Sequence, residues 1–295
     1  MKLERLSREL ICIKNAEKIL LNYPEHRVDC NKVNLHYYHA EWQKYSTGKD
    51  CNIGDYLSEI IVKWMCTNRG IDFGCTIQET KHLYAIGSIL QMGYQNATIW
   101  GTGFAFELNS VRRIPHMASF RNLDVRCVRG PKTRKTLIDL GYSCPQVYGD
   151  PAILLPLMYQ PRTLPKTDYL IIPHFSMETE TRLKYGNQHV LSMNTRNYTD
   201  VIDRICSAEK VISSSLHGLI IAEAYDIPAV FYQDRAERFN YKYEDWYGST
   251  GRSCNPIANV ETGLNMNVSK LSRGKLKEMQ EVLFETFPED LWKTK

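Results

Sequence analysis

Short apolar segments alternate with amphipathic segments along most of this chain, and that alternation restricts the possible folds more than any other feature. VNLHYYH at 33–39 alternates and is rich in β-forming residues, which predicts a first strand, and the spacing in 52–70 predicts a helix after it. Another helix is expected at 131–141, with proline in its first turn and glycine at its end. Further strands are predicted at 82–90, 97–104, 123–130 and 146–156. This order is typical of an α/β protein with a mostly parallel, doubly wound sheet.

A proline-rich stretch at 156–167 divides this pattern in two. After it the alternation restarts, with strands predicted at 168–175, 189–194, 210–215 and 227–233, and helices at 198–209, 216–226 and 269–287. We therefore expect two Rossmann-like domains that face each other across a cleft, in a GT-B-like arrangement. The expected units are a helical extension at 1–32, an N-terminal domain at 33–156 and a C-terminal domain at 157–295. The last helix is a candidate to pack back on the N-terminal domain.

The start of the chain bears on where the protein acts. The first thirty residues mix Glu with Lys and Arg, which is not the pattern of a signal peptide. Apolar runs stay below the roughly 18 residues that a membrane span needs. We therefore expect a cytoplasmic protein. Lys2, Arg5 and Arg8 could bring the first helix to the inner face of the membrane, and packing against the protein explains them equally well.

Several cofactor and metal signatures are missing from the sequence. The nine cysteines contain no C-x-x-C pair, so neither a disulfide framework nor a zinc site is predicted. GTGFAF at 101–106 has Phe106 where a dinucleotide fingerprint needs Gly or Ala, and GPKT at 130–133 lacks the order of a P-loop. We expect no bound cofactor and no dedicated catalytic metal.

A basic segment at 112–135 holds eight Lys and Arg residues against a single Asp. It can be a solvated face or a site for an anion, since clustered cations attract either water or a negatively charged partner. Aromatic residues are not interleaved with these cations, so we expect a small anion rather than nucleic acid.

The segment SSSLHG at 213–218 carries the strongest functional signal. A predicted strand runs directly into a helix here, and open α/β sheets bind ligands at the carboxyl ends of their strands. Free N–H groups and the helix dipole at such a point favour phosphate or carboxylate. His217 is suited to acid/base chemistry, and Gly218 permits close approach of a ligand or of backbone. The alternative is a capped helix whose histidine only packs. The residues expected at the anion are Ser214, Ser215, Leu216 and Gly218.

Three other positions also follow predicted strands. His174 ends the strand at 168–175, and Arg129 ends the strand at 123–130, where its guanidinium could clamp a carboxylate or phosphate. Asn52, Gly54 and Asp55 open the first long helix, where Asp55 can serve in catalysis or simply cap the helix. His174 can equally be a loop histidine without a catalytic role.

Six segments in order resemble the polysaccharide pyruvyl transferase family over about residues 33 to 251. They are N-x-G-D at 52–55, V-R-G-P-x-T at 128–133, G-D-P-A-x-L-L at 149–155, I-P-H at 172–174, S-S-L-H-G-L-I-x-A at 214–222 and FNYKYEDWYGSTG at 239–251. The resemblance implies a GT-B-like fold and transfer of the pyruvyl unit of phosphoenolpyruvate onto two hydroxyls of a sugar. The product is a cyclic ketal, and phosphate is released.

The resemblance also implies roles for individual residues. The leucine–histidine motif of the family matches Leu216 and His217, and its arginine before a glycine–proline turn matches Arg129. Some members carry Arg where this chain has Ser215, so a cation must come from Arg129, Lys242 or Arg235. His217 is the expected proton donor, with His174 and Asp55 as alternative bases. Together with the positions at strand ends and helix starts, we expect the donor to be bound by Arg129, Ser214, Ser215, Leu216, Gly218, Asn52, Gly54 and Lys242.

The expected partners are phosphoenolpyruvate and a sugar or lipid-linked oligosaccharide acceptor. A GT-B glycosyltransferase that uses a sugar nucleotide is the alternative enzyme, because the same two-domain layout serves both reactions.

Overall fold

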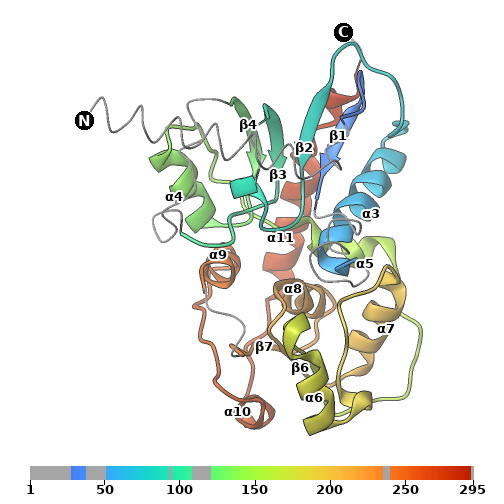
Figure 1. Cartoon of the computed structure of the whole chain (residues 1–295), viewed down its shortest axis with the longest axis vertical. Coiled ribbons are helices and arrows are strands. Elements are labelled where there is room, and N and C mark those ends of the chain that lie inside the picture. Colours follow the sequence, from blue (N-terminus) through green and yellow to red (C-terminus); the bar gives the residue numbers. More distant parts are fainter. Residues whose placement is uncertain (1–27, 38–50, 93–94, 108–120, 235–239, 294–295) are drawn as a thin grey trace.

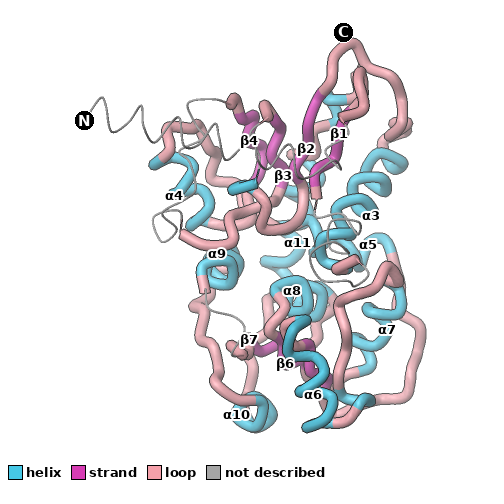
Figure 2. Tube along the Cα trace, in the orientation of Figure 1, coloured by secondary structure: helices cyan, strands magenta, loops and turns pink. Residues whose placement is uncertain are grey.

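The computed structural model describes residues 28–37, 51–92, 95–107, 121–234 and 240–293. The helix predicted near the start of the chain lies outside these residues, as do Arg112, Arg113 and Arg235. The described strands form two separate groups, one in the upper part and one in the lower part of the molecule (Figure 2).

The first sheet has four parallel strands in the order β1-β2-β3-β4. Its strands are β1 (Val33–His36), β2 (Lys81–Tyr84), β3 (Ala97–Trp100) and β4 (Leu123–Cys127). The helix α3 (Ile53–Asn68) connects β1 to β2, and α4 (Pro131–Asp139) follows β4 (Figure 1). Because the described strands of this sheet follow one another without a reversal, the predicted doubly wound order is wrong for them.

The second sheet contains β5 (Leu170–Ile172), β6 (Val211–Ser213) and β7 (Ala229–Phe231), all parallel. Single bridges extend it at both edges, since Ile171 also pairs with Val190 and Tyr232 pairs with Ile257. The chain therefore leaves β5 for the Val190 edge and then crosses to β6 on the other side. This reversal places a topological switch point between the carboxyl ends of β5 and β6, where open α/β sheets bind ligands.

Two predicted strands have another structure. In 146–156 only Tyr148 bridges to Val128, and the chain then turns into the 3₁₀ helix η4 (Pro151–Leu154) and α5 (Leu155–Met158). The side chain of Asp150 accepts a hydrogen bond from the Ala152 amide and proline occupies the first helical position, so a helix begins where apolar character suggested a strand.

In 189–194 the 3₁₀ helix η6 (Asn187–His189) is followed by isolated bridges at Val190 and Asn194. Here the hydroxyl of Ser192 accepts from the Asn194 amide and donates to Glu178. These local side-chain bonds compete with a strand ladder.

The second half of the chain contains several helices. The predicted ones are α7 (Tyr198–Ser207), α8 (Leu216–Ala224) and α11 (Arg273–Glu285), and the sequence did not predict α6 (Glu178–Tyr185), α9 (Tyr241–Ser249) or α10 (Val260–Asn265). The remaining 3₁₀ turns are η1 (Leu90–Met92), η5 (Phe175–Met177) and η7 (Glu289–Leu291). Every residue of α8 is buried, and the helix lies between the two sheets (Figure 1).

The last helix, α11, contacts residues of the first sheet. The indole N–H of Trp100 on β3 donates to the Leu283 carbonyl at 3.1 Å, and the Gln280 side chain donates to the Ile153 carbonyl at 2.8 Å. One continuous apolar core includes residues of both halves, among them Leu57, Trp100 and Leu219. Among the described residues, no helix is both long enough and apolar enough to cross a bilayer.

Candidate active site

The start of α3 in the first half contacts residues 193–194 in the second half. The amide of Ile53 donates to the Met193 carbonyl at 2.7 Å, and Asn52 forms a bridge with Asn194. The side chain of Asn52 caps α3 by accepting from the Gly54 amide at 2.9 Å. The first turn of α3 therefore lies against the second half, beside the first turn of α8, where His217 packs on Gly54. Two helix N-termini meet at this point, which favours negative charge between them.

The three serines before α8 build the turn that leads into the helix. Ser215 caps α8 by accepting from the Gly218 amide at 3.3 Å, and the Ser213 hydroxyl accepts from the Ser215 amide at 2.9 Å. The Ser214 hydroxyl donates to the Tyr232 carbonyl at 2.6 Å. Each hydroxyl thus has an internal role, so the structure favours the first-turn N–H groups of α8 over the serine hydroxyls as anion donors.

Gly218 and Leu216 serve packing in this structure. A Cβ atom at Gly218 would lie 2.6 Å from the Ser213 Oγ and 2.9 Å from the Ile172 Cδ1, so glycine lets α8 approach β5 and β6. Leu216 is buried in the core. The sequence allowed Gly218 to permit close approach either of a ligand or of other parts of the protein, and the structure shows the second.

His217 lies beside a carboxylate that belongs to η4. Its Nε2 is 3.7 Å from Asp150 Oδ2, and the histidine is 9% exposed whereas Asp150 is fully buried. The separation exceeds a normal hydrogen bond, although catalytic contacts are often long before substrate binds. Asp150 belongs to the G-D-P-A segment of the sequence, but sequence reasoning gave it no role, because its partner is distant along the chain.

The ring of His217 packs directly on the backbone of Gly54. A Cβ atom at Gly54 would lie 2.1 Å from Nδ1 and 2.5 Å from Cγ of the imidazole. Only glycine is compatible with this position of the ring, because real Cβ atoms do not come that close to other heavy atoms. Gly54 therefore determines where the imidazole lies.

Replacing Gly54 by alanine should displace the imidazole and reduce kcat by about 10²-fold or more, because displacements of about 1 Å can cost that much. Gly274→Ala on α11 is the matched control, since a Cβ atom there has no neighbour within 4 Å. That control should keep full activity and gain up to about 1 kcal/mol of stability. Steady-state kinetics and thermal melts of both variants measure the effect, and full activity in Gly54→Ala would contradict it.

Asp55 is the titratable group of the first turn of α3. The pKa of Asp55 is raised from 3.8 to about 6, mainly by burial, while the charges of His217 and Lys242 lower it and the charge of Asp150 adds a smaller increase. Asn52 is the N-cap of α3 and Asp55 lies in the first turn, so the catalytic role of Asp55 stays a prediction beside the capping alternative. A carboxyl group with a pKa near the working pH is suited to proton transfer.

The raised pKa of Asp55 predicts a pH-dependent stability. The folded protein retains the Asp55 proton up to a pH of about 6, whereas the unfolded chain loses it near pH 3.8. The contribution of Asp55 to the free energy of unfolding is therefore fully present below pH 3.8 and is lost as the pH rises to 6. We expect Asp55→Asn to melt at a higher temperature than the unsubstituted protein above pH 6, and the difference to shrink toward pH 4. Thermal melts from pH 4 to 8 measure this difference, and one that is constant across pH would contradict the assignment.

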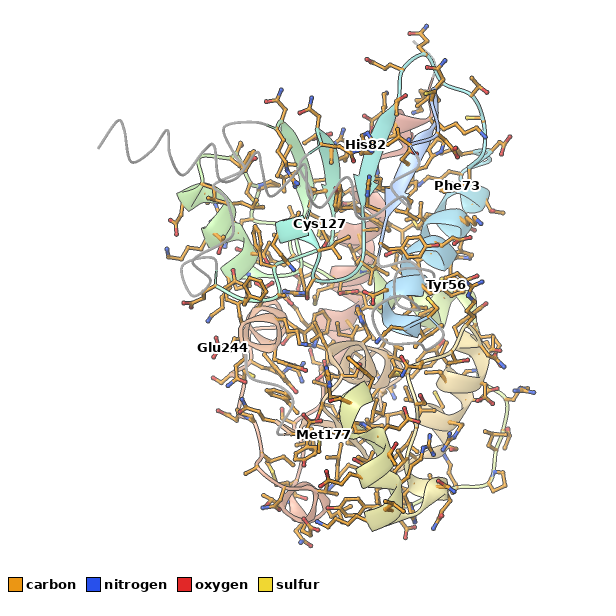
Figure 3. All side chains as sticks on the ribbon, in the orientation of Figure 1. Tyr56, Phe73, His82, Cys127, Met177 and Glu244 are labelled. Atoms are coloured by element: carbon orange, nitrogen blue, oxygen red, sulfur yellow. The ribbon has the colours of Figure 1, made fainter. Side chains whose placement is uncertain are left out.

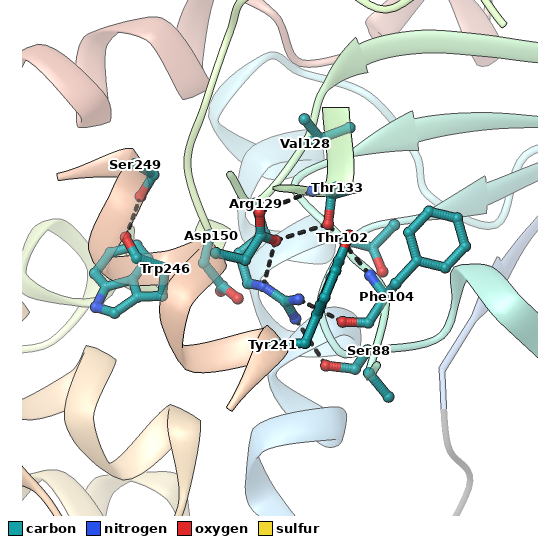
Figure 4. A network of polar contacts seen from close by, with 12 residues as sticks. Ser88, Thr102, Phe104, Val128, Arg129, Thr133, Asp150, Tyr241, Trp246 and Ser249 are labelled. Atoms are coloured by element: carbon teal, nitrogen blue, oxygen red, sulfur yellow. Dashed lines mark hydrogen bonds and ion pairs between the residues drawn. The ribbon is translucent and has the colours of Figure 1, made fainter. Parts of the chain in front are cut away.

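Arg129 is fully buried and has three partners inside the protein (Figure 4). Its Nε donates to Asp245 Oδ2 at 3.1 Å, its Nη1 to the Ser88 hydroxyl at 2.7 Å and its Nη2 to the Phe104 carbonyl at 2.6 Å. The residues Ser88, Phe104 and Arg129 follow β2, β3 and β4, so the guanidinium ties three strand ends to α9. These bonds favour a supporting role over the predicted clamp on the donor, which stays a prediction.

The helix α9 connects the two sheets. Asp245 accepts from the Thr133 amide and hydroxyl at 2.9 and 2.7 Å on the side of the first sheet. On the other side the Tyr243 hydroxyl donates to the Ser214 carbonyl at 2.6 Å, directly before α8. Lys242, between them, acts electrostatically on Asp55 and places a cation near the two helix N-termini. Asp245 lies in the last segment of the family resemblance, yet sequence reasoning assigned it no function.

Comparison with known proteins bears on these residues. Residues 94–233 match the family model described as polysaccharide pyruvyl transferase. This segment belongs to the polysaccharide pyruvyl transferase family. The resemblance predicted from the sequence motifs is thereby confirmed, and the family implies a transferase. Arg129, Asp150 and His217 all lie inside the matched segment, whereas Gly54, Asp55 and Lys242 lie outside it.

Two curated relatives are similar to the chain. Uncharacterized protein L143 of Acanthamoeba polyphaga mimivirus is 27% identical over 195 residues, which are 62% of this chain and 64% of that protein. Succinoglycan biosynthesis protein ExoV of Rhizobium meliloti is 24% identical over 188 residues, which are 59% of this chain and 55% of that protein. The chain thus spans somewhat more than half the length of these relatives.

A solved structure of an uncharacterized protein from Klebsiella pneumoniae subsp. pneumoniae covers 83% of this chain and 98% of its own. Its TM-score is 0.47 at 13% sequence identity, which is below the level that indicates a shared fold.

His174 lies at the switch point of the second sheet, shortly after β5. Its amide donates to Asp234 at 3.0 Å and its Nδ1 lies 2.9 Å from the Ser176 hydroxyl, while its ring contacts Phe175. These contacts cap η5 and hold the ring beside the strand end. A catalytic role for His174 stays a prediction.

Several cations of the basic segment at 112–135 have acidic partners in its described part. Arg126 pairs with Asp124 and Asp290, and Lys132 pairs with Glu244, which lies on α9 (Figure 3). Lys135 pairs with Asp139, and Arg129 is buried with Asp245. These partners include nearby residues, Asp124 and Asp139, and residues distant in the sequence, Glu244, Asp245 and Asp290. The anion site expected in this segment stays a prediction. Within the described ranges, no group of three or more His, Cys, Asp or Glu is arranged to hold a metal ion.

Proposed function

We propose that this protein transfers the pyruvyl unit of phosphoenolpyruvate onto two hydroxyls of a sugar in a polysaccharide or its lipid-linked precursor. The product is a cyclic pyruvate ketal, and phosphate is released. The family match supports pyruvyl transfer, and the name of one relative refers to succinoglycan biosynthesis. The observation that carries the proposal is the His217 imidazole, held between two acidic residues where α3 and α8 begin.

We place the proposed donor site between the carboxyl ends of the two sheets, in the cleft that we expect between two facing Rossmann-like domains. Phosphoenolpyruvate carries a phosphate and a carboxylate, and both are anions that helix N-termini bind. The first turns of α3 and α8 supply N–H groups, and Lys242 supplies a cation near Asp55. Lys242 is therefore our choice for the cation that Ser215 does not provide, and Arg129 bonds Asp245 on the same helix, α9.

The proposed chemistry begins with a proton. The protonated imidazole of His217 gives a proton to C3 of the enol, so that C2 becomes electrophilic and one sugar hydroxyl adds to it. The C2–O bond to phosphate then breaks, and the second hydroxyl closes the ring at C2. Of the two hydroxyl protons, one ends on C3 and the other on phosphate. His217 regains its proton from a hydroxyl, and the Asp55 carboxylate accepts the second proton and passes it to phosphate.

Incubation with phosphoenolpyruvate and a panel of glycosides tests the proposal. We expect a mass increase of one pyruvyl ketal on a glycoside and release of an equal amount of phosphate. Thermal shift measurements with phosphoenolpyruvate and with UDP-sugars separate this function from a sugar-nucleotide glycosyltransferase. Stabilisation by UDP-sugars alone, together with hexose transfer, would replace the proposal by that alternative.

A further inference from the structure

Two buried polar atoms near the proposed reaction centre have no hydrogen-bond partner within the described part of the chain. They are His217 Nε2 and Asp150 Oδ2, and they face each other at 3.7 Å. Buried polar groups in native proteins are nearly always bonded, so two such atoms side by side need an explanation. Their separation is short enough for a small shift to form a direct hydrogen bond.

The carboxylate of Asp150 is held in one orientation. Its Oδ1 accepts from the Ala152 amide at 3.0 Å as the cap of η4, and Pro151 fixes the backbone at the next residue. The residue is fully buried, and η4 packs against α3, α8 and α11. Because Oδ1 is committed to the cap, Oδ2 is the oxygen directed at the imidazole.

The two nitrogens of the His217 ring have different surroundings. Nε2 faces Asp150, whereas Nδ1 is directed at Gly54, where the absence of a side chain leaves room for the ring against the first turn of α3. Asp55 follows Gly54 in that turn, so a carboxyl group lies on this side as well. Which nitrogen carries the proton of a neutral imidazole is set by the bond that the other ring nitrogen makes.

We propose that Asp150 is a positioning residue that holds the proton of neutral His217 on Nε2, so that Nδ1 is the nitrogen that exchanges protons with substrate. This inference rests on the proposed function. Nδ1 of the imidazolium gives its proton to C3 of the enol, and neutral Nδ1 later takes a proton from a sugar hydroxyl. The Nε2 proton stays directed at Asp150 throughout. The charged groups around the ring are Asp150 from η4 and Asp55 from α3, with Lys242 from α9 acting on Asp55.

Asp150→Asn tests the proposed role of Asp150 directly, because the cap of η4 fixes the orientation of the new side chain. Asparagine caps helices well, and its amide oxygen must take the place of Oδ1 to accept from the Ala152 amide. The NH₂ group then faces Nε2, and a donor there forces Nε2 to be an acceptor. The neutral imidazole is thereby driven into the Nδ1–H form, which cannot accept the hydroxyl proton.

We expect Asp150→Asn to lower kcat by about 10²–10⁴-fold, as loss of the correct tautomer does in a catalytic triad, with KM for phosphoenolpyruvate changed less than about threefold. The ¹⁵N NMR spectrum of the imidazole should change from the Nε2–H to the Nδ1–H pattern. Asp150→Ser is a second variant that keeps a cap and removes Oδ2; it should lose kcat in the same range. Asp203→Asn is the control, since Asp203 is equally buried but bonds Tyr159 and Arg162.

The outcomes separate this inference from the proposed function. An Nε2–H pattern that persists in Asp150→Asn, or a kcat within threefold of the unsubstituted protein in both variants, overturns the role of Asp150. The NMR comparison needs no turnover, so it decides the tautomer even if phosphoenolpyruvate proves not to be the donor. A change of tautomer in Asp203→Asn would also overturn the inference, because the effect would then not depend on Oδ2.

Discussion

His217→Ala lowers kcat for ketal formation by about 10²–10⁴-fold, the usual contribution of one positioned acid/base group. The side chain is nearly buried between α3 and η4, and the described fold does not depend on a hydrogen bond from its Nε2. We therefore expect loss of turnover without loss of the folded state. Ketal formation measured by mass spectrometry, together with a thermal melt, checks both parts.

His189→Ala is the matched control for this variant. The ring of His189 stacks on Tyr169 with centroids 4.2 Å apart, and its Nδ1 lies 3.3 Å from the Tyr169 carbonyl. Loss of that ring should affect stability modestly and leave kcat unchanged. Near-normal turnover in His217→Ala would remove the acid/base role from this residue and transfer it to Asp55 or His174.

Arg129→Ala should lower the free energy of unfolding by about 3–5 kcal/mol, because it leaves the buried carboxylate of Asp245 without its counter-charge. Ser88 and Phe104 lose their partner in the same substitution. Since Arg129 also holds α9, which carries Lys242, we expect KM for the donor to rise in whatever fraction remains folded. Urea denaturation and steady-state kinetics measure the two effects.

Arg126→Ala in the same segment is the control for Arg129. Arg126 is partly exposed and pairs with Asp124 and Asp290, and surface pairs of this kind contribute about 0–1 kcal/mol. Equal destabilisation by the two substitutions would contradict the bridging role of Arg129. A raised KM in Arg129→Ala with unchanged stability would instead restore the direct clamp on the donor.

Local sequence signals predicted most of the regular elements. The strands β1 to β7 and the helices α3, α4, α7, α8 and α11 each coincide with a predicted segment, because apolar periodicity and helix-ending residues act within a few residues. The two misassigned strands, at 146–156 and 189–194, are apolar enough for burial, but Asp150 and Ser192 redirect the backbone through their own hydrogen bonds. Burial and strand geometry are separate properties, and apolar composition reports only the first.

The sequence predicted where the site residues lie in the chain better than it predicted their hydrogen-bond partners. The positions of Asp55, Arg129, Ser214 and His217 were predictable, because each lies where a predicted helix begins after a predicted strand. The internal bonds of Arg129 and of the serines were not predictable, because they depend on Asp245, Ser88 and Tyr232, which come from other elements. For the same reason the sequence did not predict that Arg126 pairs with Asp290 and that Lys132 pairs with Glu244.

By itself, the sequence determined the α/β class, the order of most strands and helices, and the histidine that opens α8, since each depends on interactions between near neighbours in the chain. Only the tertiary structure decided that Gly54 supports the imidazole, that Asp150 faces Nε2 and that Asp245 holds Arg129. These contacts join residues that are 67 to 163 positions apart. Electrostatic and steric effects act through space over a few ångströms, and no local pattern in the chain records which distant residues the fold brings within that range.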